Sequence, residues 1–191
     1  RPIYNPGVLP FICIALITPL LHRTSRKKVR ATWVKSIKQI SGAAIALMAG
    51  IAMVQLLVNS GDNTAGYPSM LSVLAQEMAR VSGKGYVFIS PLIGVLGAFM
   101  AGSNTVSNIL FSSLQFETAT LLNVPAVVII ALQVVGGGIG NMVCINNIVA
   151  VAATVGIVGV EGRIIRRNFL PMILYSLLAA GIGFFLISIF R

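Results

Sequence analysis

Five polar side chains interrupt a long uncharged segment of this sequence. The interruption reads Gly102-Ser103-Asn104-Thr105-Val106-Ser107-Asn108. Polar side chains are costly at bilayer depth unless they face protein or a water-filled cavity. Hydroxyls and amides act through hydrogen bonds, so the chemistry predicted here is recognition of a small polar molecule. These five polar residues are the first predicted substrate-binding residues.

Two local geometries would let this run bind a ligand. In a continuous helix, Asn104 and Asn108 share one face because they are four residues apart. In the other geometry, Gly102 ends one half-helix and Ser103 caps the next, and the freed N–H groups that follow point at a bound anion. Broken helices of this kind form substrate sites in secondary transporters. The alternative without a ligand is a hydrogen-bonded patch between packed helices.

A second cluster lies about thirty residues further along the chain. The run Gly136 to Gly140 is one that a continuous helix would hardly choose, and it predicts an interruption there. Three asparagines follow it, and they are the second set of predicted binding residues: Asn141, Asn146 and Asn147. The alternative is tight helix packing through Gly136 and Gly140, which are four residues apart.

Motifs for catalysis are missing from the sequence. It holds no phosphate-binding G-x-x-x-x-G-K-[ST], no G-x-S-x-G and no H-E-x-x-H. The single histidine, His22, stands among basic residues and is expected to be a solvated loop residue. Cys13 and Cys144 lie in apolar runs and are expected to be small buried side chains. We therefore expect no enzyme, no catalytic residue, no metal site and no cofactor.

The composition predicts an integral membrane protein. Apolar residues make up 57% of the 191 positions and charged residues only 9%. A soluble domain carries roughly 25% charged residues. This excludes a soluble enzyme, a disordered chain and a disulfide scaffold, and the lipid bilayer is the expected surrounding.

Ten of the fourteen cationic residues gather in two short clusters beside long apolar runs. Seven lie between Arg23 and Lys38, and three more are Arg163, Arg166 and Arg167. Short basic clusters of this kind are typical of cytoplasmic loops. A nucleic-acid-binding protein would instead show a folded basic face with aromatic residues, so no nucleic acid is expected as a partner.

The uncharged runs predict an all-α, polytopic transmembrane helix bundle with broken or re-entrant helices. About five to six transmembrane segments are expected, roughly at 4–21 (partial), 39–58, 85–111, 124–135, 142–160 and 168–190. The basic stretch 22–38 is expected to be a loop. Helical spacing of apolar residues predicts a short amphipathic helix over 68–81. If both basic clusters are cytoplasmic, four crossings separate them.

Two blocks of this sequence resemble the bacterial L-lactate permease family. They read PLIGVLGAFMAGSNTVSNILFSSLQ (91–115) and ALQVVGGGIGNMVCINNIVAVAATVGIVGVEG (131–162). The resemblance covers roughly residue 40 to the C-terminus. It implies a multi-pass protein of the bacterial inner membrane that imports L-lactate, with D-lactate and glycolate as further substrates, together with protons. Because members of the family have about a dozen spans, we expect residues 1–191 to be the C-terminal part of a transporter whose N-terminal half is missing here.

Glu117 is the predicted proton-coupling residue. It is the only acidic residue between Lys84 and Glu161. One interpretation places it in a short interfacial turn before Val124, and the other places it inside the protein near the broken helix, kept neutral by burial. Two rival functions stay open at this point, a non-transporting membrane subunit and a channel.

Overall fold

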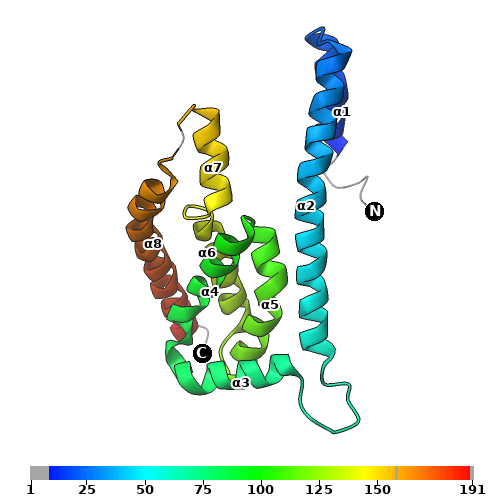
Figure 1. Ribbon diagram of the computed structural model, residues 1–191. Coiled ribbons are helices and arrows are strands. Elements are labelled where there is room, and N and C mark those ends of the chain that lie inside the picture. Colours follow the sequence, from blue (N-terminus) through cyan, green and yellow to red (C-terminus); the bar gives the residue numbers. More distant parts are fainter. Residues whose placement is uncertain (1–8, 158, 190–191) are drawn as a thin grey trace. The chain divides into compact units, whose positions relative to one another are not determined.

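The computed structural model describes residues 9–157 and 159–189, and every regular element in these ranges is a helix (Figure 1). This confirms the predicted all-α class. Residues 4–8 of the first predicted segment, residue 158 of the segment 142–160 and residue 190 of the last segment lie outside the described ranges. The chain divides into two compact units, Arg1–Leu47 and Met48–Arg191.

The first unit holds α1 (Leu9–Leu21) and the beginning of α2 (Arg26–Asn59). The basic stretch 22–38 was expected as a loop, but most of it is the first part of α2. Lysine and arginine are good helix formers, and nothing between Arg26 and Lys38 breaks a helix. The prediction for Cys13 is also wrong, because no residue of α1 is buried and this thiol is exposed.

The second unit begins with the end of α2 and the amphipathic helix α3 (Met70–Ser82). The hydroxyl oxygen of Ser69 caps α3 by accepting a hydrogen bond from the Ser72 N–H at 3.1 Å. Leu71 and Ala75 are buried against Leu114. Figure 1 shows α3 lying across one end of the helices that follow. The amphipathic helix predicted over 68–81 is therefore confirmed.

A helical hairpin follows α3, after the 3-10 turn Gly83–Gly85. Its arms are α4 (Tyr86–Ala101) and α5 (Asn104–Leu121). The arms are antiparallel, since α4 contacts α5 through Tyr86 and Gln115 at one end and through Gly94 and Ser107 nearer the tip. The stretch 85–111, predicted as one transmembrane segment, is thus split by a reversal of the chain at Gly102.

The next two helices, α6 (Ala126–Gly140) and α7 (Ile145–Thr154), follow one another in the same direction (Figure 1). The segments 124–135 and 142–160 were expected to run in opposite directions, and that is wrong. The interruption expected at 136–140 is also displaced, because α6 stays helical through Gly140 and the break comes at 141–144. The number of membrane crossings stays a prediction.

The glycines of α6 permit close contact with α4, which explains why they are helical. A Cβ atom at Gly136 would overlap the Pro91 carbonyl oxygen, and one at Gly140 would lie 2.5 Å from the Val95 carbonyl oxygen. Such small-residue contacts let two helix backbones approach closely. The packing interpretation of Gly136 and Gly140 is therefore confirmed.

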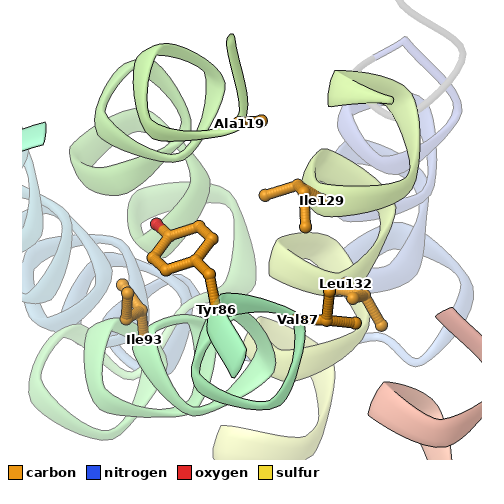
Figure 2. Packing of buried hydrophobic residues seen from close by; sticks show 6 residues of the cluster. All are labelled: Tyr86, Val87, Ile93, Ala119, Ile129 and Leu132. Atoms are coloured by element: carbon orange, nitrogen blue, oxygen red, sulfur yellow. The ribbon is translucent and has the colours of Figure 1, made fainter. Parts of the chain in front are cut away.

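The last helix, α8 (Glu161–Ile189), runs back along α4 and α6. Its Phe184 ring lies 6.0 Å from the Phe88 ring of α4, centre to centre. The main apolar core joins α4, α5 and α6 (Figure 2), where the Tyr86 side chain lies between the helices with Ile129 and Leu132 of α6 beside it.

Among the described residues, three helical stretches are long and apolar enough to cross a membrane: 70–101, 126–152 and 161–189. The first contains the turn at Gly83–Gly85, so α4 alone has 16 residues and is about 24 Å long. Beyond the break at 141–144, α7 extends for 10 more residues, about 15 Å. The hairpin tip, which contacts this break, therefore stops well short of the far end of α7, as in a re-entrant hairpin.

Candidate functional site

The hairpin tip is built by Gly102 and Ser103. Gly102 ends α4 in the left-handed conformation with φ +70°, which favours glycine, and its N–H donates to the Ala98 carbonyl at 2.8 Å. Ser103 is extended and caps α5, and its hydroxyl oxygen accepts from the Val106 N–H at 3.4 Å. This is the half-helix geometry that the sequence left as one of two possibilities.

The two interrupted stretches meet at this tip. A Cβ atom at Gly102 would lie 3.3 Å from Cys144 Sγ and 3.5 Å from Asn146 Nδ2. The helices α5 and α7 begin at this contact and run in opposite directions away from it. Both therefore direct their partly positive N-terminal ends at one place. Cys144 is buried, as expected.

Hydrogen-bond donors dominate the tip. In the described part of the chain, the N–H groups of Asn104 and Thr105 have no acceptor, as is usual for the first turn of a helix. The amino groups of Asn104 and Asn146 also donate to none of the described residues. No Lys, Arg or His occurs from Gly85 to Gly162. Within residues 85–162, the positive potential at the tip therefore comes from backbone and side-chain amides.

The remaining predicted residues lie nearby but differ in accessibility. Ser107 is buried, and its hydroxyl donates to the Gly94 carbonyl at 2.8 Å. Asn108 lies one turn further along α5 than Asn104. The Asn147 amino group donates to Asn141 Oδ1 at 3.0 Å, which ties the break to α7. The structure thus brings the two clusters together at Gly102 and Asn146, whereas Asn141 and Asn147 bond to each other.

A buried chain of amides connects the hairpin to α6, and the sequence interpretation missed it. The Tyr86 hydroxyl donates to Gln115 Oε1 at 2.7 Å, and Gln115 Nε2 donates to Gln133 Oε1 at 2.9 Å. Gln133 Nε2 in turn donates to Ser107 Oγ at 3.0 Å. Glutamines inside uncharged runs are as costly at bilayer depth as asparagines. The same reasoning, applied to every polar residue in the uncharged runs, would have singled out Gln115 and Gln133.

Glu117 lies within α5, so the interpretation that placed it in a turn is wrong. It is half-buried, and it forms no hydrogen bond or ion pair with the described residues. Fourteen residues separate it from Ser103, which corresponds to about 21 Å along the helix. Glu117 therefore cannot touch a ligand bound at the hairpin tip, and any part it takes in proton coupling acts over a distance.

This arrangement can hold a small anion without a cationic side chain. A carboxylate placed between the ends of α5 and α7 would accept hydrogen bonds from backbone N–H groups and asparagine amino groups. Hydrogen bonds to a charged group contribute about 1.5–3 kcal/mol each. The site offers mainly hydrogen-bond donors, and the one thiol beside the tip, Cys144, is buried.

Comparison with known proteins finds relatives that are named as permeases. A family model described as L-lactate permease matches residues 1–190. A relative from Haemophilus influenzae, whose name also refers to L-lactate permease, is 38% identical over 188 residues. That alignment covers 98% of this chain and 34% of the relative.

Two Escherichia coli K12 proteins match a shorter part. An L-lactate permease is 36% identical over 102 residues, 53% of this chain and 18% of that protein. A glycolate permease is 36% identical over 110 residues, 58% of this chain and 20% of that protein. The chain thus spans about a third or less of the length of these relatives. No solved structure matches it.

Proposed function

Because the chain belongs to the L-lactate permease family, we propose that it forms the C-terminal part of a carrier that moves L-lactate, and also glycolate, across the bacterial inner membrane together with protons. The single observation that carries this proposal is the meeting of the α5 and α7 N-terminal ends at Gly102 and Asn146. A 2-hydroxy monocarboxylate offers one carboxylate, which matches a site made of donors.

Binding would begin with the carboxylate at the hairpin tip. Its oxygens would accept from the N–H groups of Asn104 and Thr105 and from the Asn104 and Asn146 amino groups. Helix ends that converge on an anion near the middle of a bundle are typical of secondary transporters. Alternating access would then expose this site to each side of the membrane in turn.

Coupling to one proton would make the transport cycle electrically neutral. Moving one net charge against ~100 mV costs about 2.3 kcal/mol, so an anion carrier gains from binding a proton with its substrate. The L-lactate permease name of the relatives supports the substrate, and proton coupling is our proposal.

Lactate uptake tests the function directly. Proteoliposomes that contain the complete carrier should take up lactate saturably when their interior is more alkaline than the medium, and glycolate should compete. The 191-residue chain alone should insert but give no uptake, because part of the carrier is absent. Flux proportional to concentration would indicate a channel, and no lactate flux in the complete protein would refute the proposal. Robust saturable uptake by the chain alone would show that it is sufficient.

Glu117 remains our candidate for the coupled proton. In the complete carrier, Glu117→Gln should abolish lactate accumulation driven by a pH gradient but retain lactate exchange, because exchange needs no net proton release. Counterflow and pH-driven uptake measure the two activities separately. Glu77→Gln is the matched control, since Glu77 is exposed and paired with Arg80 at 2.6 Å. If Glu117→Gln still concentrates lactate with unchanged pH dependence, the proton binds elsewhere.

A further inference from the structure

Two residues of α6 face the two asparagines of α5. Gly137 lies opposite Asn104, and Gln133 lies opposite Asn108. Asn104 and Asn108 are four residues apart in α5, and Gln133 and Gly137 are four residues apart in α6. The two contacts therefore lie about one helical turn from each other. Because α5 and α6 are antiparallel, Asn104 contacts Gly137, the later of the two α6 residues.

The lack of a side chain at Gly137 leaves room for the Asn104 side chain. Asn104 Oδ1 is buried and has no hydrogen-bond partner in the described part of the chain. It occupies the space of a Cβ atom at Gly137, and Asn104 Cγ would lie 3.1 Å from that atom. A carbonyl oxygen can rest there against the Gly137 Cα–H group. An amino group could not, since it would be buried without an acceptor. The Asn104 amino group must therefore point away from Gly137.

Gln133 fixes the second asparagine, and its own direction is fixed by a backbone carbonyl. Gln115 Nε2 donates to the Ser90 carbonyl at 2.9 Å, and this carbonyl can only accept. The same amino group donates to Gln133 Oε1, so Gln133 Nε2 faces α5. There it lies 3.0 Å from Ser107 Oγ, 3.3 Å from the Ser107 carbonyl oxygen and 3.4 Å from Asn108 Oδ1, so these three acceptors share its two hydrogens. The Asn108 amino group is left without a partner in the part of the chain that is described.

From these contacts we infer that Gly137 and Gln133 are positioning residues that fix the direction of the Asn104 and Asn108 amides, so that the carrier selects a carboxylate over a neutral carboxamide. The inference rests on the proposed function. An asparagine amide that could rotate would offer an oxygen as readily as an amino group. Because the oxygen is held beside Gly137, only the amino group faces a bound anion.

Lactate and lactamide together test this inference. Lactate can only accept at its carboxylate, whereas the carboxamide of lactamide can both donate and accept. In the complete carrier, inhibition of labelled lactate uptake by each unlabelled compound gives their two affinities. Gly137→Ala displaces the flexible end of Asn104, and it should lower the lactate-to-lactamide affinity ratio at least tenfold.

Gly181→Ala is the control, because Gly181 also lies in a helix and an added methyl group there would meet nothing within 4 Å. Its affinity ratio should equal that of the wild type. An equal loss of both affinities in Gly137→Ala, or an unchanged ratio, would overturn the inference and would reduce Gly137 to a packing residue.

A second variant covers the case in which Gly137→Ala does not fold. Gln133→Leu removes the donor that holds Asn108 Oδ1 and should also lower the ratio, by about threefold to tenfold. An unchanged ratio in Gln133→Leu counts against the inference. Failure of the proposed function looks different, because then unlabelled lactate would not compete even in the wild type.

Discussion

Asn104→Asp is expected to reduce the apparent affinity for lactate by on the order of a thousandfold. One carboxylate oxygen of the aspartate would take the place of Asn104 Oδ1 on Gly137, and the other would stand where the amino group now points. The substrate carboxylate would then face a like charge. At about 4 Å and an effective dielectric constant near 20, that repulsion is about 4 kcal/mol. Concentration-dependent uptake by the complete carrier measures the loss.

Asn104→Ala separates the lost hydrogen bond from the added charge. It should weaken lactate binding about tenfold to a hundredfold, since a hydrogen bond to a charged group contributes roughly 1.5–3 kcal/mol. Asn123→Asp is the matched control, because Asn123 is exposed in the turn after α5 and has φ +52°, a conformation that aspartate tolerates. Wild-type affinity in Asn104→Asp would exclude Asn104 from the site.

Gly136→Ala is expected to prevent most of the protein from folding. The added methyl group would overlap the Pro91 carbonyl oxygen and lie 2.8 Å from Pro91 Cα. These are backbone atoms, which cannot rotate aside, so α4 and α6 would have to separate. Overpacking of a well-packed core typically costs 1–3 kcal/mol or more. The yield of monodisperse protein in detergent and its thermal unfolding midpoint measure the effect.

Gly181→Ala gives the comparison for this experiment. Gly181 also lies in a helix, and a Cβ atom there would meet nothing within 4 Å. Alanine favours the helix by roughly 1 kcal/mol over glycine, so this variant should be as stable as the wild type or slightly more stable. Equal midpoints for Gly136→Ala and the wild type would show that α4 and α6 do not pack backbone to backbone.

Local features of the fold could be predicted from the sequence, and long-range ones could not. Gly102 followed by Ser103 is a helix stop followed by a helix cap, and both signals act within a few residues. The direction of α6 relative to α4 depends on contacts between residues far apart in the chain. Glycines 136 to 140 illustrate this, because the same residues favour a break when isolated and a helix when packed against Pro91 and Val95.

The candidate site shows the same division. The anion-binding end of α5 could be predicted from residues 102–106 alone, and in the structure Gly102 ends α4 and Ser103 caps α5 there. The meeting of Gly102 with Asn146 required the hairpin to lie against the second break, which no local pattern specifies. Gln115 and Gln133 were missed because neither belongs to the two polar clusters that the sequence singled out, and only their contact explains how both polar groups are accommodated.

The contact between Gln115 of the hairpin and Gln133 of α6 also bears on how the protein is made. Gln115 leaves the ribosome eighteen residues before Gln133, its buried partner. Within the hairpin, Tyr86 and the Ser90 carbonyl already bond to the Gln115 amide, but one of its N–H groups has no acceptor until Gln133 emerges. An unpaired polar group in the bilayer costs several kcal/mol. We therefore expect α4, α5 and α6 to enter the bilayer together.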